Sequence, residues 1–354
     1  MAWRKEGPRV GARHNPYETP LATLQQVHPI GIVDKKGPIA YHYGGLLCKG
    51  GTSCSPSLAD VEFFVKTIAI FYQGLKEDTS HFAAQLVPTL EGQGHRVRVV
   101  DIRNEGPECA DSSFKECNLA LVLGGDGTII HAARLCACID LPIVGINFGR
   151  VGFLTELEPD EVSRDIGHFL NGDKSVWVDE RAMLRATLNQ DGREEEFLAM
   201  NDIVIARGTW PRGVRVHVWV DKYYYNTTYA DGMIVSTATG STAYNMSVGG
   251  PLLHPQVRSL VLSPIAPHLA SNRSLVLQPE AKVRLQIFTN AQNGVFSADG
   301  QLNREVKDGA TVTIEKSPYI TRFLRRRPPT HFYQIINAKL KNDGMQASES
   351  HHVT

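Results

Sequence analysis

The feature that most constrains the fold is a short apolar run that stops at two glycines. Residues 119–123 are all apolar, as in a strand buried on both faces, and helical character resumes at residues 129–133. Between them lies a glycine-rich loop with one carboxylate, which consists of Gly124, Gly125, Asp126, Gly127 and Thr128. A strand that passes through such a loop into a helix is typical of parallel α/β sheets, in which ligand loops lie at the carboxyl ends of strands. We therefore expect a ligand site at residues 124–128.

The neighbouring segments repeat this alternation of strand and helix. Residues 67–72 form an apolar run, a helix is expected from residue 78 to the glycine at position 92, and residues 97–100 and 142–147 are typical of further strands. Beyond residue 159 the pattern changes to short segments that are mostly alternating, which predict a β-rich region. The predicted fold is an α/β N-terminal domain with a mostly parallel sheet, followed by a β-rich second domain.

The length of 354 residues suits two domains, each with its own core. The expected organisation, from the N-terminus, is a partly disordered extension (1–58), an α/β domain with the glycine loop (59–158), a β-rich domain (159–305), a C-terminal segment that returns to the first domain (306–341) and a disordered tail (342–354).

Composition excludes several functions. Acidic and basic side chains number 37 each, so the chain lacks the basic excess of a nucleic-acid-binding protein. No apolar run approaches the roughly 18 residues of a membrane span. The six cysteines are too sparse and irregular for a disulfide scaffold, and no Cys-x-x-Cys spacing indicates zinc. We expect a cytoplasmic protein that binds neither nucleic acid nor membrane and has no metal site of its own. The one dense cationic run, residues 325–327, is expected to be a solvated corner.

The loop at residues 124–128 has the chemistry of an anion site. Positions without side chains let phosphate oxygens approach the backbone, and a helix start offers unpaired N–H groups. Asp126 is then anomalous, because a carboxylate repels phosphate unless it binds a cation or accepts a proton from an attacking hydroxyl. This combination favours phosphoryl transfer. The alternative is a tight turn capped by Thr128, and neither a Walker A pattern nor G-x-G-x-x-G occurs in the chain.

Two polar segments interrupt the predicted β-rich half. Asn201 and Asp202 lie within an otherwise apolar strand, where burial is costly without partners, and an amide beside a carboxylate suits two neighbouring ribose hydroxyls. A bulge or turn with this pair at its tip is the alternative. Residues 236–242 carry five hydroxyl side chains around a glycine, which suits a polar ligand at the N-terminus of a following helix. Tyr244 could stack on that ligand, although singly it is more typical of a core or rim aromatic.

Together these segments resemble the NAD kinase family. Residues 124–128 match the GGDGT signature, which lipid kinases and, in variant form, phosphofructokinases share, whereas Asn201 and Asp202 match the NE/D motif of NAD kinases. Residues 239–244 match the family's GSTAY-type block, and residues 145–154 its G-x-N-x-G-x-x-G-F-L stretch. The resemblance implies that Asp126 is the catalytic carboxylate within the phosphate loop. It also implies NAD contacts at Asn201, Asp202, Asp231, Ser241, Thr242, Ala243, Tyr244, Ser247 and Asp299.

The resemblance further implies phosphorylation of the 2′-hydroxyl of the adenosine ribose of NAD by ATP, by a homo-oligomer that is a dimer or tetramer. Because an aspartate of pKa about 3.9 is a weak base for a ribose hydroxyl, we expect Asp126 to orient the hydroxyl and accept its proton late. Mg²⁺ should arrive with the ATP phosphates. The rival hypotheses are a lipid or sugar kinase and a non-catalytic NAD-binding sensor, against which the intact Asp126 argues.

Overall fold

The computed structural model describes residues 67–106, 114–150, 152–209, 212–268, 273–289 and 292–349. The extension expected at residues 1–58 lies outside these residues. No helix in the described part of the chain is long and apolar enough to cross a membrane.

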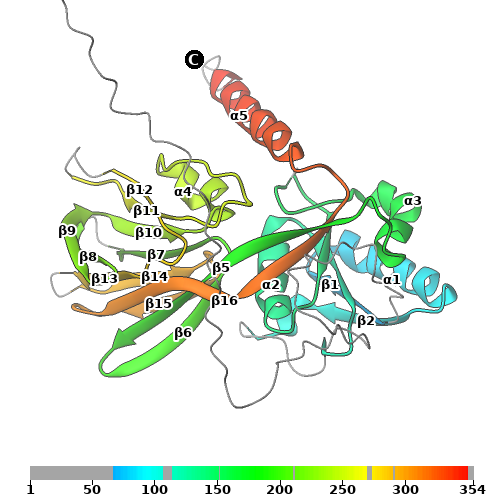
Figure 1. Ribbon diagram of the computed structural model, residues 1–354, viewed down its shortest axis with the longest axis horizontal. Helices are drawn as coiled ribbons and strands as arrows, with labels where there is room; N and C mark the ends of the chain where they lie inside the picture. Colours follow the sequence, from blue (N-terminus) through cyan, green and yellow to red (C-terminus); the bar gives the residue numbers. More distant parts are fainter. Residues whose placement is uncertain are drawn as a thin grey trace, which may run out of the picture. The chain divides into compact units, whose positions relative to one another are not determined.

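The first domain is a parallel sheet covered by helices on both faces (Figure 1). Strand β1 pairs with β2 and β3, and β3 pairs with β4, all in parallel. Every second residue of β1 packs against α1 and α3, and the others pack against α2, which explains why the strand is apolar throughout. The elements are β1 (Thr67–Tyr72), α1 (Glu77–Gly92), β2 (Arg96–Asp101), β3 (Leu119–Gly124), α2 (Asp126–Ala137), β4 (Ile143–Asn147) and α3 (Pro159–Leu170).

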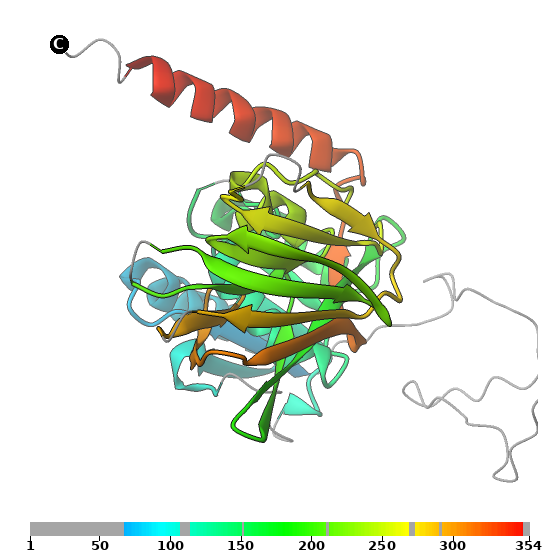
Figure 2. The same cartoon turned by 90° about the vertical axis from the view of Figure 1, so that its left-hand side faces the viewer.

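The second domain consists of two β-sheets whose inner faces form one apolar core (Figure 2). The six-stranded sheet has the order β12-β11-β10-β7-β14-β15, and its strands pair in an antiparallel manner. Its strands are β7 (Asp202–Arg207), β10 (Gly232–Ser236), β11 (Leu260–Ile265), β12 (Leu275–Leu277), β14 (Gly294–Ala298) and β15 (Leu302–Val306). The facing strands are β5 (Trp177–Gln190), β6 (Arg193–Ala199), β8 (Val214–Val220), β9 (Tyr223–Ala230), β13 (Val283–Phe288) and β16 (Thr311–Arg325).

The long strand β16 joins the two domains into one ten-stranded sheet. It pairs with β5 in an antiparallel manner along most of its length and with β13 near its start. Near its end Phe323 pairs with Ile143 of β4, the contact that a return of residues 306–341 to the first domain requires. Eight of the ten strands follow the order β2-β1-β3-β4-β16-β13-β8-β9, while β5 pairs with β16 and β6 with β5 beside this path. The phosphate loop and the β-rich domain are therefore attached to one continuous sheet.

Two helices differ from the sequence expectation. The helix expected after Ser241 is only a single turn, α4 (Tyr244–Ser247), preceded by a 3-10 turn (Gly240–Thr242). The last helix is longer than expected, because α5 (His331–Glu349) runs through most of the segment where a disordered tail was predicted. Its second half contains alanine, leucine, lysine and glutamine without proline, and such residues favour a helix even where no apolar face is evident.

Candidate active site

Asp126 is the first residue of α2 and is held in one orientation by the backbone of a neighbouring loop. Its Oδ2 accepts a hydrogen bond from the N–H of Phe153, and its Oδ1 accepts one from the N–H of Leu154, both at 3.0 Å. The Asp126 carboxylate can approach this loop because residue 152 is a glycine. A Cβ atom at that position would lie 2.3 Å from Asp126 Oδ1. The predicted catalytic carboxylate is therefore fixed at the end of β3, with part of its surface accessible.

The loop that holds Asp126 is itself held by Arg325. The guanidinium Nη1 of Arg325 donates to the carbonyl oxygens of Leu154 and Thr155, both at 3.0 Å, and contacts the Glu156 carboxylate at 3.3 Å. The expectation of a solvated corner at residues 325–327 is wrong for Arg325, whose side chain is only 7% exposed. Its acidic partners come from distant parts of the chain, so the sequence run alone could not reveal them.

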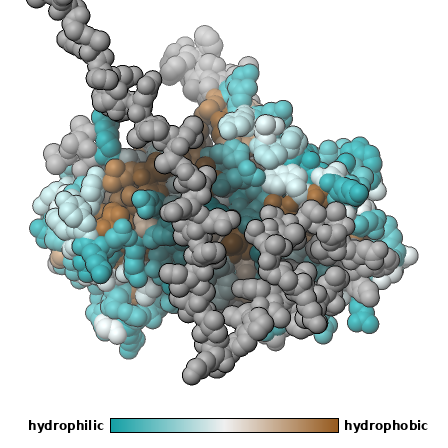
Figure 3. Space-filling view, viewed as in Figure 1, coloured by the Kyte–Doolittle hydropathy of each residue, from teal (hydrophilic) through white to brown (hydrophobic). Residues whose placement is uncertain are grey.

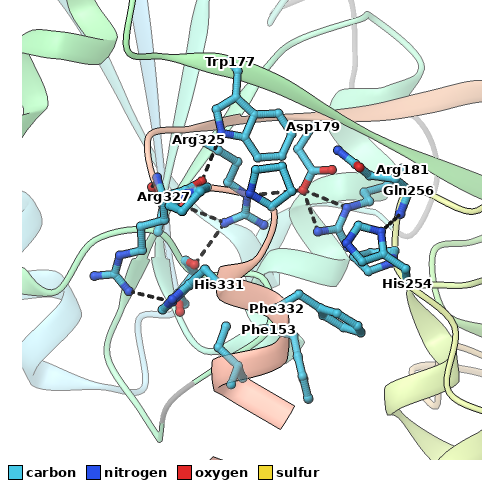
Figure 4. A pocket seen from close by; sticks show the side chains of 16 residues that line it. Phe153, Trp177, Asp179, Arg181, His254, Gln256, Arg325, Arg327, His331 and Phe332 are labelled. Carbon is cyan, nitrogen blue, oxygen red and sulfur yellow. Dashed lines mark hydrogen bonds and ion pairs between the residues drawn. The ribbon is translucent and has the colours of Figure 1, made fainter. Parts of the chain in front are cut away.

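Arg325 belongs to a buried cluster of charges beside a small pocket of about 40 Å³ (Figure 4). Arg181 and Arg325 both point at Asp179, with the Nε atom of Arg181 2.9 Å from Asp179 Oδ2. Burial alone would raise the pKa of Asp179, but the two guanidinium groups outweigh it and hold this pKa below its usual value. Arg181 also donates to Thr239 Oγ1 at 3.3 Å, which links the cluster to the hydroxyl-rich segment.

On the other side of the glycine loop lies a larger cleft of about 640 Å³. Its lining includes Lys76 and Arg103 beside the N-terminus of α2, together with the acidic Glu105. Arg103 is also paired with Asp101. His131 adds less charge, because burial and the nearby Arg134 lower the pKa of its imidazole. A cleft with basic side chains and free backbone N–H groups at a helix N-terminus suits an anionic ligand with several phosphates. The loop residues that line the cleft are Gly125, Gly127 and Thr128.

Asn201 and Asp202 lie at the start of β7, in a turn of residues 200–202 that we call the acceptor turn. The side chain of Asp299 accepts hydrogen bonds from the backbone N–H groups of Met200, Asn201 and Asp202 at 2.9, 2.7 and 3.2 Å. Burial, and secondly the charge of Asp299, raise the pKa of Asp202 to about 7. The predicted ribose-binding carboxylate is therefore poised to change charge near neutral pH.

The hydroxyl groups of residues 236–242 are used mainly to fold the segment and join it to the acceptor turn. Thr237 Oγ1 donates to the carbonyl of Met200 at 2.7 Å and accepts from the N–H of Gly240 at 3.0 Å. Ser236 Oγ donates to the carbonyl of Asn201 at 3.2 Å, and Ser241 Oγ donates to the carbonyl of Ala238 at 2.7 Å. The helix N-terminus expected here is not developed, because α4 has only four residues, and a ligand at this segment stays a prediction.

The remaining predicted contacts lie farther out. Tyr244 is 44% exposed and Ser247 is exposed, both on α4, while Thr242 and Ala243 are half-buried. Asp231 lies at the opposite end of β10 from Ser236, about 16 Å away at roughly 3.3 Å per strand residue. Its carboxylate is 2.9 Å from Arg207 Nε. The structure thus brings residues 124–128, 200–202 and 236–242 together and places Asp231 at a distance that only an extended ligand could bridge.

Sequence reasoning missed the polar residues that support the site, namely the three arginines Arg134, Arg181 and Arg325 and the neutral Gln301. Each has at least one partner 58 or more positions away in the chain, although Arg181 also pairs with the nearby Asp179. The one available signal was Asp299 beside Gly300, an Asp-Gly pair typical of a hairpin turn, which locates the turn without its partners.

The site can now be compared with known proteins. The sequence model of the ATP-NAD kinase N-terminal domain matches residues 69–174, and that of the ATP-NAD kinase C-terminal domain matches residues 200–326. A NAD kinase of Chloroflexus aurantiacus is 35% identical over 280 residues, which cover 78% of this chain and 99% of the relative. A NAD kinase of Dehalococcoides mccartyi is 36% identical over 283 residues, which cover 78% and 97%.

The chain belongs to the NAD kinase family. Solved structures agree with this family at the level of the fold. A yeast NADH kinase complexed with NADH matches with a TM-score of 0.68 and 21% identity, over 78% of this chain and 88% of that one. A NAD kinase from Archaeoglobus fulgidus in complex with ATP matches with a TM-score of 0.61 and 25% identity, over 77% and 97%. The predicted family and the predicted two-part fold are confirmed, and the chain is a phosphotransferase.

Proposed function

We propose that this NAD kinase family member transfers the terminal phosphoryl group of ATP to the 2′-hydroxyl of the adenosine ribose of NAD, giving NADP and ADP. The observation that carries the proposal is the position of Asp126. Its carboxylate lies at the N-terminus of α2 and is fixed by two backbone N–H groups of the segment around Phe153. The cleft with basic side chains lies on the other side of the loop. A carboxylate in this position can serve a hydroxyl group that faces a donor phosphate.

The donor triphosphate is assigned to the cleft of about 640 Å³. Lys76 and Arg103 supply charge there, and the loop glycines allow phosphate oxygens to reach the backbone. Mg²⁺ carried by the triphosphate would supply charge neutralisation in this cleft. The described residues contain no group of three or more His, Cys, Asp or Glu side chains that could cage a metal, so the donor set present fits an ion carried by phosphates, with Asp126 as the nearby carboxylate.

Asp126 is assigned the role of orienting the attacking hydroxyl. Each of its oxygens accepts one backbone hydrogen bond, and each retains lone-pair capacity for a substrate hydroxyl. Because phosphoryl transfer has a loose transition state, the proton leaves the hydroxyl late and a strong base is not required.

The acceptor NAD is assigned to the acceptor turn and the segment that follows Gly240. Asn201 and Asp202 would bind ribose hydroxyls, and the half-buried Thr242 and Ala243 would contact the adenosine with Tyr244. Ser247 and Asp231 would contact more distant parts of the dinucleotide. The hydroxyl of Ser241 and the carboxylate of Asp299 bond to the chain itself, so these two residues would support the ligand indirectly.

The proposal includes a homo-oligomer, a dimer or tetramer, in the cytoplasm. Strand β9 lies at one end of the ten-stranded sheet, and its four tyrosines, at positions 223, 224, 225 and 229, are each at least 40% exposed. An exposed edge strand rich in aromatic residues supports pairing with a second copy. The face seen in Figure 3 is otherwise mostly hydrophilic, with hydrophobic residues gathered over part of the β-rich domain.

The deciding experiment is a coupled assay in which purified protein, NAD, ATP and Mg²⁺ are combined and NADP is detected by an NADP-specific dehydrogenase. We expect turnover, and a loss of about 10²- to 10⁴-fold in kcat for Asp126→Asn. Asp160→Asn, a change in the first turn of α3, is the matched control and should retain full activity. Normal turnover by Asp126→Asn would contradict the assignment. Tight NAD binding without turnover would favour the sensor, and phosphorylation of diacylglycerol or fructose 6-phosphate in its place would favour the rival kinases.

A further inference from the structure

Two Asp-Gly hairpin turns in this chain share positive φ angles at both residues but place their carboxylates differently. Asp191 and Gly192 close the β5–β6 hairpin, and Asp299 and Gly300 lie in the β14–β15 hairpin. All four residues have positive φ, at 52°, 73°, 54° and 67°, which Asp tolerates and Gly adopts freely. The Asp191 side chain is 58% exposed, beside Lys307. The Asp299 side chain is 0% exposed, so turn chemistry alone does not explain its position.

The Asp299 carboxylate has a complete set of hydrogen-bond donors. Oδ1 accepts from the N–H groups of Asn201 and Asp202, and Oδ2 accepts from the N–H of Met200 at 2.9 Å. Oδ2 also accepts from Arg134 Nη1 at 2.9 Å. Burial raises the pKa of Asp299, while Arg134 and the backbone donors oppose that effect. Four donors converging on one carboxylate define the conformation of the acceptor turn.

Arg134 carries the connection into the first domain. It lies in α2, two turns after Asp126, and its side chain is 2% exposed. Its Nη2 donates to Gln301 Oε1 at 2.6 Å, and Gln301 Nε2 donates to the carbonyl of Gly127 at 2.8 Å. A continuous path of hydrogen bonds therefore runs from the acceptor turn through three side chains to the phosphate loop.

We propose that Asp299 and Arg134 are positioning residues for phosphoryl transfer, which set the spacing between the acceptor turn and the phosphate loop. The proposal rests on the proposed function. Transfer through a loose transition state depends on alignment of acceptor oxygen and phosphorus, and a displacement of about 1 Å can lower the rate about 10²-fold. In this assignment Asp299 touches no substrate, and Arg134, which also lines the donor cleft, acts through the backbone that Asp299 holds.

The test is Asp299→Asn, because Asn also tolerates positive φ and preserves the turn while it removes the charge. We expect kcat for NADP formation, per folded enzyme, to fall about 10²-fold and the KM for NAD to rise, with the KM for ATP unchanged. Asp191→Asn is the matched control and should leave all three constants unchanged. A lower melting temperature with wild-type kinetic constants would mean a purely structural role and would overturn the proposal.

A second variant covers the case in which Asp299→Asn does not fold. Arg134→Lys keeps a positive charge near Asp299 but cannot bond Asp299 and Gln301 together, since an ammonium lacks the planar fork. We expect an intermediate loss in kcat and a rise in the KM for NAD. Wild-type kcat in this variant would also overturn the proposal. Failure of the proposed function itself would be recognised separately, because the wild type and Asp191→Asn would then form no NADP.

Discussion

The phosphate loop and the acceptor turn are both polar segments at strand ends, but they use their polar atoms in opposite ways. In the phosphate loop Asp126 keeps lone-pair capacity, and the glycines line an open cleft. In the acceptor turn the backbone N–H groups donate hydrogen bonds to Asp299. The carbonyls of Met200 and Asn201 accept hydrogen bonds from the hydroxyls of Thr237 and Ser236. The first region is therefore built to meet a ligand directly. The second must first be assembled by its own hydrogen bonds.

The difference teaches that the density of polar residues in a motif does not measure the number of ligand contacts. Five hydroxyl residues surround Gly240. The hydroxyls of Ser236, Thr237 and Ser241 all donate hydrogen bonds to backbone carbonyl groups of the chain itself. Gly240 belongs to the same assembly, because a Cβ there would lie 2.1 Å from the carbonyl oxygen of Asn201. Changes in the two regions should consequently separate into effects on turnover and effects on folding.

The largest expected effect would sharpen this contrast at Asp202, which is proposed to bind the ligand and whose burial disfavours the charged carboxylate. Its pKa is raised to about 7 in the folded chain, so its ionisation opposes folding increasingly as pH rises from about 4 to 7, and the penalty then levels off. Asp202→Asn lacks this penalty and should be more stable than the wild type by up to about 4 kcal/mol at pH 8.

The measurement for Asp202→Asn is urea unfolding at pH 5 and pH 8, together with the KM for NAD. The stability advantage of the variant should be smaller at pH 5, and its KM for NAD should rise. An advantage that does not change with pH would show that the Asp202 carboxyl titrates normally in the folded state.

The next effect tests whether the phosphate loop depends on the orientation of Asp126. In Gly152→Ala the new methyl group would lie 2.3 Å from Asp126 Oδ1 and must displace the carboxylate. We expect a loss of about 10²-fold in kcat with little change in unfolding free energy. Gly92→Ala is the control, since a Cβ at that position meets no atom within 4 Å. Equal activity in the two variants would show that turnover does not depend on the orientation of Asp126, and would contradict the contrast drawn between the two regions.

The smallest effect concerns folding of the second region. Thr237→Val removes the hydroxyl that joins the carbonyl of Met200 to the N–H of Gly240, and leaves both buried groups without this partner. The free energy of unfolding should fall by about 1–3 kcal/mol. Thr89→Val on the exposed face of α1 should cost less, since its hydroxyl donates only to the carbonyl of Gln85. A loss of turnover with unchanged stability would instead indicate that Thr237 contacts the ligand.

The sequence was informative where neighbouring residues act together. The all-apolar strand before Gly124 and the abrupt glycines predicted the β3–α2 unit, because burial on both faces and a tight turn are local demands. The three motifs predicted the family for the same reason. The support beneath them was not predictable, since Arg325 and Arg134 find their acidic partners 146 to 169 positions away. Such pairs are set by topology, and a single sequence carries no local trace of them.

The strands β5 and β16 have a mechanical consequence. The chain enters the second domain on β5 and leaves it on β16, and these two strands are hydrogen-bonded to each other from Trp177 and Arg325 to Asn189 and Thr311. A rotation of one domain against the other would therefore require this two-stranded ribbon to bend, because the domains are not joined by a loop there. The register of the ribbon shifts between Lys316 and Ile320. Because the joint is a two-stranded ribbon, we expect the phosphate loop and the acceptor turn to keep the same separation with and without bound nucleotide.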